Sequence, residues 1–264
     1  MLLNFNGSYK MLPTAAGCEI YPVVSIIIST LNDLVGLKST INSLTLNNYP
    51  AKEIIVIDGG SSDLTVEYLK ANATQVSVFI SEPDSGIYDA WNKGLRVASG
   101  KYVAFLGSGD SYSEYGLISL AKCAMDNPKA DFISARIEIL RSNVIIRTLG
   151  EPWVWQKFRR YMNASHAGSL HSRRLFDLHG EFDTSYRIAG DYELLLRARD
   201  GLIAAYVDVT AVRMIADGAS YSGYQVFNET ERAKLQNQAV APFIARIDRY
   251  AAQAKRFIRN HFVD

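Results

Sequence analysis

The stretch 22-PVVSIIISTLN-32 decides the fold, because Val23 to Ile28 form an almost unbroken run of β-branched apolar residues. Such a run predicts a strand buried on both faces of a parallel sheet. It is far shorter than the roughly 20 apolar residues that a membrane-spanning helix needs. After it, apolar residues recur at helical spacing, so a helix follows the strand; they are Leu34, Leu37, Ile41 and Leu44.

The rest of the first half repeats this alternation of strand and helix. Further strands are expected at residues 53–57 (EIIVI), 76–80 and 101–106 (KYVAFL), with helices at 63–70 and 86–98. Strands that alternate with helices indicate parallel pairing through right-handed crossovers. The sequence therefore predicts an α/β fold, a Rossmann-like sheet flanked by helices.

The second half has a mixed pattern. Residues 131–140 and 144–149 alternate apolar and polar side chains, which is typical of a half-exposed antiparallel pair. Residues 151–171 have no clean period, and helices are expected at 172–178 and 191–199 around an irregular segment, with a strand at 204–207. From residue 226 the chain is expected to be helical. This pattern predicts an N-terminal extension (1–20), one domain (21–225) and a C-terminal helical tail (226–264).

Composition excludes several classes of protein. The chain has 264 residues, 28 basic and 27 acidic, so it lacks the charge of a protein that coats nucleic acid. Its two cysteines, Cys18 and Cys123, form no Cys-x-x-Cys pair, which fits a reducing compartment. The first residues lack the basic start and apolar run of a secretory signal. We expect a cytoplasmic protein.

Small, polar and acidic residues follow four successive predicted strands. The sequences are STLND at 29–33, DGGSSD at 58–63, EPDSG at 82–86 and GSGD at 107–110. Any one of them alone is more typical of a turn or a helix cap. Ligands bind outside the carboxyl ends of the strands in open α/β sheets, so their coincidence indicates a binding site.

The chemistry of this site is not that of a phosphate-binding loop. The chain has no GxxxxGK[ST]. Its one Gly-x-Gly sequence, at Gly107 and Gly109, has Tyr112 where a dinucleotide-binding motif needs its third glycine. A dinucleotide dehydrogenase is therefore disfavoured. Carboxylates repel phosphate unless a divalent cation lies between them, so Asp110 is a candidate ligand for Mg²⁺ or Mn²⁺.

Five ordered motifs together resemble glycosyltransferase family 2. They are PVVSIIISTLN at 22–32, IVIDGGSSD at 55–63, EPDSGIYDAWNKG at 82–94, FLGSGD at 105–110 and GDYELLLR at 190–197. The resemblance covers about residues 20–215 and implies the GT-A fold. It is nearest to the non-processive enzymes of bacterial exopolysaccharide and O-antigen clusters.

The resemblance also implies roles for single residues. Asp191 would be the general base, and Asp110 the last aspartate of the metal-binding motif. The donor nucleotide would lie against the ends of the first four strands, at Thr30, Asn32, Asp58, Asp84 and Ser108. The donor is expected to be linked to UDP, with dTDP and GDP as alternatives. The acceptor would be a glycan or a lipid-linked sugar.

The sequence departs from the family pattern at three places. Gly59 stands where the family often has a second aspartate that contacts uracil. Gly109 leaves Asp110 nearly alone in the metal motif. The Q-x-x-R-W motif of processive synthases is absent after Asp191, which favours transfer of one sugar per encounter. Gly59 and the weakened metal motif leave a catalytically inactive glycan-binding or nucleotide-binding relative as an alternative. A nucleotidyltransferase, which also has a Rossmann-like sheet and a metal-binding aspartate, is the other alternative.

Two candidate residues have competing structural interpretations. Asp191 precedes the run YELLL and could be a helix N-cap. His166 could contact the metal or the diphosphate, but a histidine in a polar stretch is more often only hydrogen bonded.

The tail at 242–262 is a basic amphipathic helix by its spacing. It is expected either to contact an anionic membrane at the inner face, or to dock on the domain or on another subunit.

We therefore predict an inverting, metal-dependent glycosyltransferase that moves one sugar from a nucleotide-sugar donor during surface polysaccharide synthesis. Mg²⁺ or Mn²⁺ is the expected cofactor, and nucleic acid is not an expected partner. The sequence does not decide between a monomer and an oligomer.

Overall fold

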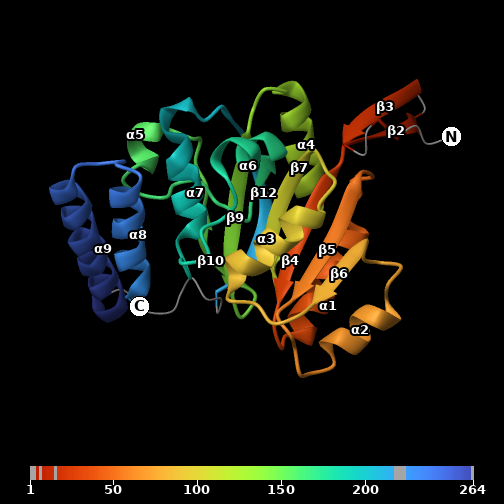
Figure 1. The fold of residues 1–264 in the computed structure, drawn as a ribbon, viewed down its shortest axis with the longest axis horizontal. Helices are drawn as coiled ribbons and strands as arrows, with labels where there is room; N and C mark the ends of the chain where they lie inside the picture. Colours follow the sequence, from red (N-terminus) through yellow and green to blue (C-terminus); the bar gives the residue numbers. More distant parts are fainter. Residues whose placement is uncertain (1–3, 6–7, 15–16, 217–223, 263–264) are drawn as a thin grey trace.

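The structure, a computed structural model, describes residues 4–5, 8–14, 17–216 and 224–262. Its centre is a mixed nine-stranded sheet with the order β6-β5-β4-β7-β11-β9-β12-β8 and with β10 paired to β9 (Figure 1). The strands are β4 (Val24–Thr30), β5 (Lys52–Asp58), β6 (Val78–Ser81), β7 (Tyr102–Gly107), β8 (Ser111–Tyr112), β9 (Phe132–Arg141), β10 (Val144–Leu149), β11 (Ser169–Ser172) and β12 (Ala204–Ile215).

Helices cover both faces of this sheet and extend beyond one end of it. They are α1 (Leu34–Leu46), α2 (Thr65–Ala71), α3 (Ile87–Val97), α4 (Gly116–Asp126), α5 (Trp155–Phe158), α6 (Arg173–His179), α7 (Gly190–Ala198), the 3-10 turn η1 (Arg199–Gly201), α8 (Gln225–Gln236) and α9 (Pro242–Phe262). The α/β prediction is therefore confirmed.

The parallel half of the sheet forms as the apolar runs predict. β4 pairs in parallel with β5 on one side and with β7 on the other, and β5 pairs in parallel with β6. β9 and β10 form the expected antiparallel hairpin.

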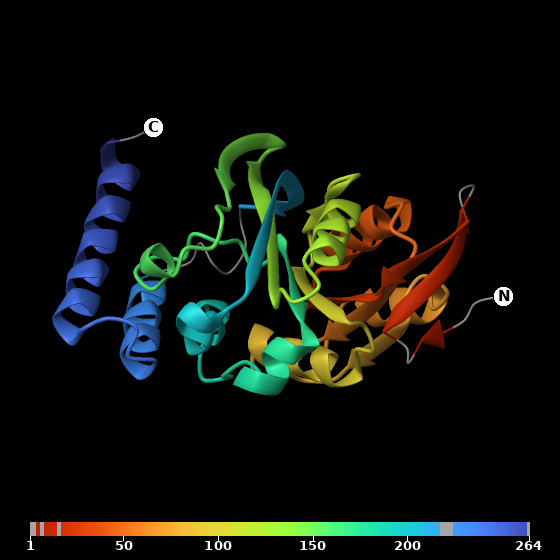
Figure 2. The ribbon, with the colours of Figure 1, turned by 90° about the horizontal axis from the view of Figure 1, so that it is seen from above.

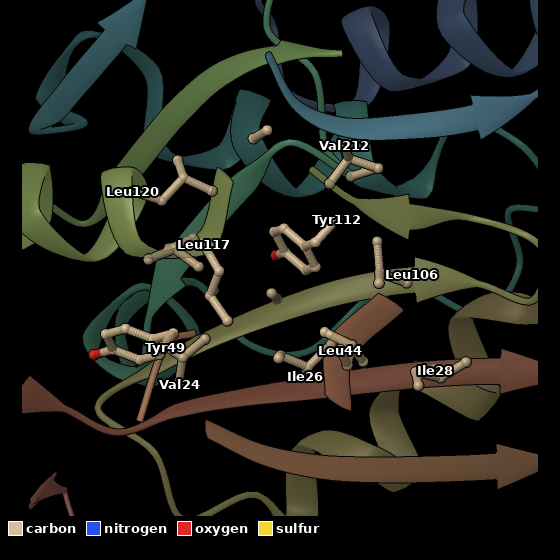
Figure 3. Packing of buried hydrophobic residues seen from close by; sticks show 14 of the residues in the cluster. Val24, Ile26, Ile28, Leu44, Tyr49, Leu106, Tyr112, Leu117, Leu120 and Val212 are labelled. Atoms are coloured by element: carbon tan, nitrogen blue, oxygen red, sulfur yellow. The ribbon is translucent and has the colours of Figure 1, made fainter. Parts of the chain in front are cut away.

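The core divides into two layers because alternate residues of β4 point to opposite faces. Ile26 and Ile28 pack with α1 and α4 in one layer, whereas Ile27 packs with α3 in the other. Figure 3 shows the first layer, where Leu44 of α1 and Leu117 of α4 meet the strands.

The N-terminal residues form a small sheet that the sequence did not predict. β1 (Asn4–Phe5), β2 (Tyr9–Thr14) and β3 (Gly17–Pro22) pair as antiparallel neighbours in that order. The ammonium of Lys10 donates a hydrogen bond of 3.1 Å to the carbonyl of Pro50, which joins this sheet to the domain.

Two predicted boundaries in the second half were wrong. The strand expected at 204–207 continues to Ile215 as β12, which pairs in parallel with β9. The C-terminal tail is two helices, α8 and α9, because residues 237–241 interrupt it. Figures 1 and 2 show both helices at the end of the molecule opposite the N-terminal sheet.

Candidate active site

The predicted donor residues lie together at the carboxyl edge of the parallel strands. Thr30, the last residue of β4, is in register with Asp58, the last residue of β5, and Asp58 is in register with Ser81 of β6. The amide of Ser108 donates a hydrogen bond of 3.0 Å to the carbonyl of Ser29. Parallel pairing therefore brings four separate strand ends to one edge.

Asp58 is fully buried and holds this edge together. Its carboxylate accepts hydrogen bonds from the amide of Ser61 at 3.0 Å, from the hydroxyl of Ser81 at 2.6 Å, and from the hydroxyl of Ser61. The buried charge is thus matched by donors, as a buried carboxylate requires. Ser61 and Ser81 were not among the predicted site residues.

Asn32 joins the loops after β4 and β5. Its backbone has a φ of 50°, a left-handed conformation that asparagine adopts more readily than most residues. Its amide donates to the hydroxyl of Ser61 at 2.7 Å, and its side-chain oxygen accepts from the amide of Ser62 at 2.8 Å. Asn32 therefore fixes the shape of the predicted nucleotide pocket.

Gly59 is a point of close approach rather than an ordinary turn residue. A Cβ added to it would lie 2.5 Å from Oδ2 of Asp84, so any side chain there would displace that carboxylate. Asp84 in turn accepts a hydrogen bond of 2.9 Å from the amide of Gly86. The absence of a second aspartate after β5 thus leaves the space that Asp84 occupies.

Asp110 is buried behind a glycine-containing turn. Its carboxylate accepts from the amide of Gly107 at 3.0 Å, and its backbone carbonyl accepts from the hydroxyl of Thr40 at 2.7 Å. Burial raises the pKa of Asp110 to about 7. Ser108 donates to the carboxylate of Asp33 at 2.7 Å.

A divalent cation at Asp110 would need further oxygen ligands from the bound donor and from water. Among the described residues, no three His, Cys, Asp or Glu side chains gather into a group that could hold a metal ion. Asp110 is an oxygen ligand of the type that Mg²⁺ and Mn²⁺ prefer, and such ions commonly complete their shell with phosphate oxygens and water.

Asp191 lies in the first turn of α7, where Ala189 is the N-cap, so the interpretation of Asp191 as the N-cap was wrong. One of its carboxylate oxygens accepts from the amide of Tyr192 at 2.9 Å and lies 3.2 Å from the hydroxyl of Tyr88. That hydroxyl also lies 2.7 Å from the carbonyl of Ile188, so its single proton is shared between two acceptors. Burial raises the pKa of Asp191 to about 6.

The α3 motif connects the donor edge to Asp191. A Cβ on Gly86 would lie 2.6 Å from Nη1 of Arg187, and a Cβ on Gly190 would lie 2.8 Å from the Tyr88 ring. The segments around residues 84–88 and 187–191 are therefore packed directly against each other.

Glu229 of α8 supports the same segment and carried no signal in the sequence. Its buried carboxylate accepts hydrogen bonds from three consecutive backbone amides, at 3.1 Å from Arg187, 2.8 Å from Ile188 and 2.9 Å from Ala189. It therefore fixes the loop that leads directly into Asp191.

His166 lies apart from these contacts, within an aromatic cluster. Its ring stacks on those of Trp91 and Phe105, with centroids 4.9 Å and 5.2 Å away, and lies 4.6 Å from that of His171. Neither of its nitrogens has a hydrogen-bond partner within the described part of the chain. Burial lowers the pKa of His166 well below its usual range. Its role toward a metal or diphosphate stays a prediction.

A small cavity of about 210 Å³ lies at the opposite edge of the sheet, beside Lys101, Asp131, Arg173 and Arg174. Three of the four cations that line it have protein partners: Arg174 with Asp131, Arg173 with the carbonyl of Ala98, and Lys101 with the hydroxyl of Tyr9. The predicted site residues lie at the strand-end edge and not in this cavity.

Sequence comparison decides the family. The profile described as glycosyl transferase family 2 matches residues 25–173, more than half of the chain. This chain belongs to glycosyltransferase family 2.

The relatives agree with this assignment. An uncharacterised glycosyltransferase of Mycobacterium tuberculosis is 35% identical over 182 residues, which are 67% of this chain and 69% of the relative. A PGL/p-HBAD biosynthesis glycosyltransferase of Mycobacterium bovis is 28% identical over 200 residues, 71% of this chain and 75% of the relative.

Solved structures confirm the GT-A fold. A crystal structure of Staphylococcus aureus TarS in complex with UDP-GlcNAc matches with a TM-score of 0.70 at 15% identity, over 92% of this chain and 76% of that one. The mannosyltransferase PcManGT of Pyrobaculum calidifontis, in complex with GDP-Man and Mn²⁺, matches with a TM-score of 0.59 at 18% identity, over 89% of this chain and 75% of that one. No helix among the described residues is long and apolar enough to cross a membrane.

Proposed function

We propose that this family 2 glycosyltransferase transfers one sugar, with inversion, from a nucleotide-sugar donor to a glycan or lipid-linked acceptor in the synthesis of a surface glycoconjugate. The observation that carries the proposal is the partly buried carboxylate of Asp191, packed through Tyr88 against the segment that adjoins the donor edge. The enzymes of this class need a base on one side of the sugar and charge stabilisation on the other.

Asp191 has the properties of the base. Its pKa of about 6 leaves it ionised at neutral pH, with a higher proton affinity than an ordinary aspartate. As the acceptor hydroxyl attacks the anomeric carbon, its proton passes to the Asp191 carboxylate, and the bond between that carbon and the nucleoside diphosphate breaks. Attack on the face opposite the leaving group inverts the anomeric configuration.

The donor is bound by the strand-end residues. Asn32 and Asp58 shape the pocket through their contacts with Ser61 and Ser62, while Asp84 and Thr30 lie at neighbouring positions of the same edge. Asp110 would hold Mg²⁺ or Mn²⁺ together with the donor diphosphate, and the bound cation would supply positive charge against the leaving group.

UDP is the preferred nucleotide in this proposal, with dTDP and GDP as alternatives. The structural relatives were solved with UDP-GlcNAc and with GDP-Man, so the fold accommodates both pyrimidine and purine diphosphates in other proteins. Thermal-shift measurements with each nucleoside diphosphate and Mn²⁺ would identify the nucleotide, because a ligand of the native state alone raises its stability.

The decisive experiment compares Asp191→Asn with the unchanged protein. We expect the variant to retain the nucleotide-induced thermal shift and to lose at least 100-fold in kcat, since general base catalysis contributes roughly 10²–10⁴-fold. The matched control is Asp183→Asn. Asp183 lies in a loop, and its carboxylate accepts a hydrogen bond of 2.9 Å from the amide of Ser185.

The outcomes separate the competing functions. Unchanged turnover in Asp191→Asn would remove Asp191 as the base. Nucleotide binding without transfer in the unchanged protein, across a panel of donors and acceptors, would instead favour an inactive binding relative.

A further inference from the structure

The helix α9 presents an apolar face away from the rest of the molecule. Phe243, Ile247, Tyr250 and Ile258 are 66%, 56%, 56% and 53% exposed. With Ala254, also exposed, they lie three or four residues apart and therefore share one side of the helix. We call these five residues the outer face of α9.

The opposite side of α9 is firmly attached. Ala245 and Asp248 are buried, and the Asp248 carboxylate accepts a hydrogen bond of 2.9 Å from the ammonium of Lys234 on α8. It also forms an ion pair with Arg160, from the segment after α5. Polar and ionic groups thus hold the helix in place, and most of its large apolar side chains remain outside the core.

The charges of α9 are of one sign wherever they are accessible. Among the residues whose side chains the structure describes, its basic residues are Arg246, Arg249, Lys255 and Arg256, and its single acidic residue, Asp248, is 1% exposed. The Arg246 side chain is 72% exposed and lies 4.0 Å from Glu231, a separation at which an exposed pair contributes little. Lys255 is also exposed. The outer face is therefore apolar, with cations beside it.

The apolar outer face and the cations beside it together indicate what binds there. A second copy packed against the same face would bring the same cations from both helices together, which is unfavourable. A membrane surface with anionic headgroups matches both features, since the apolar side chains enter the acyl boundary and the cations meet the headgroups. The helix lies at one extreme of the molecule in Figures 1 and 2, where a flat surface can reach it.

We propose that the outer face of α9 is a peripheral membrane-binding surface, selective for anionic lipid, on which the helix lies parallel to the bilayer. The proposal does not depend on the transfer reaction, because it concerns the folded chain and lipid alone. It would bring the enzyme to the surface where a lipid-linked acceptor is found.

The test is flotation of the full chain with phosphatidylcholine vesicles that contain 0 or about 30% phosphatidylglycerol, at low and high salt. We expect binding only with the anionic lipid, and its loss at high salt, because screening weakens attraction to the surface. Ile247→Ser with Tyr250→Ser should abolish flotation. Arg246→Gln with Lys255→Gln should weaken binding on the order of fivefold per charge.

Matched controls come from other surfaces. Leu178→Ser removes an exposed apolar residue, 62% exposed, on α6, and Lys122→Gln removes an exposed cation on α4; both should bind as the unchanged chain does. Circular dichroism of each variant verifies its fold. A chain that never floats with anionic vesicles overturns the proposal. So does a dimer, measured by analytical ultracentrifugation, that Ile247→Ser with Tyr250→Ser converts to a monomer, since the face would then bind a second copy.

Discussion

The hydroxyl of Tyr88 adjusts the proton affinity of Asp191. It lies 3.2 Å from the carboxylate, and a hydrogen bond to the charged form lowers a carboxyl pKa, partly opposing the effect of burial. Tyr88 itself has a pKa raised well above its usual value by burial, so it stays a neutral donor.

Tyr88→Phe should therefore raise the pKa of Asp191 above its value of about 6. A base is active only when ionised, so the acidic limb of the pH profile of kcat/KM should move to higher pH, by up to about one unit. Turnover above pH 8 should fall much less than turnover at pH 6. Tyr186→Phe, which removes a hydroxyl bonded to Gln236 at 3.0 Å, is the control. An acidic limb that stays in place in Tyr88→Phe would contradict this role.

The sequence predicted the positions of site residues better than their contacts. Thr30, Asp58 and Asp110 lie at strand ends because each follows an apolar run that ends abruptly, and such runs are visible in the sequence. The bridge from Asn32 to Ser62 joins residues 30 positions apart through a left-handed backbone, and no local pattern encodes it.

At the scale of elements, strands with continuous apolar runs were predicted and irregular ones were not. The strand β12 was expected at residues 204–207, and the charged Asp208 and the polar Thr210 follow that stretch. It continues to Ile215 through two register shifts against β9, at which the side-chain alternation breaks. The polar Thr210 and Arg213 are both bound by Glu138 of β9, a partner that only the pairing provides.

The anchoring of α7 by α8 leads to a prediction at the same scale. Oε2 of Glu229 accepts from all three amides of residues 187–189, and Oε1 accepts from the amide of Arg187 and from Nε2 of Gln225. Glu229→Gln replaces one of these oxygens with an NH₂ group, so the donors that face that position meet another donor. An unsatisfied buried donor costs about 1–3 kcal/mol. For a domain of this size the melting temperature should fall by roughly 2–10 °C, and kcat should fall because the loop before Asp191 loosens.

A second readout separates positioning from simple destabilisation. The charge of Glu229 raises the pKa of Asp191, so the acidic limb of kcat/KM in Glu229→Gln should move to lower pH, opposite to its movement in Tyr88→Phe. Glu231→Gln, on the same helix but paired with Arg249, should leave the limb unchanged. A loss of stability with an unmoved limb would mean that Glu229 acts on the fold alone.

At the scale of the whole molecule, burial shifts the pKa values of two sets of groups, and the two sets have opposite effects on stability at acid pH. Burial raises the pKa values of Asp110 and Asp191 to about 7 and about 6, so protonation of these carboxyls stabilises the folded state as pH falls toward 3.8. Burial lowers the pKa of His171 from 6.5 to about 3, and that of His166 well below 6.5. The histidines therefore destabilise the fold below pH 6.5.

Comparison with a histidine variant isolates the second effect. Below pH 6.5 the unfolded chain binds a proton at His171 that the folded chain, whose pKa there is about 3, does not bind. For each pH unit below 6.5, the free energy of unfolding of the unchanged protein should therefore fall by about 1.4 kcal/mol relative to that of His171→Leu. Urea unfolding at pH 7, 6, 5 and 4.5 should show the variant gaining stability steadily against the unchanged protein, with His179→Gln as the less buried control. A stability difference that does not vary with pH would mean that the ring of His171 is protonated or hydrated in the folded state, and that the aromatic cluster around Phe105 does not exclude charge.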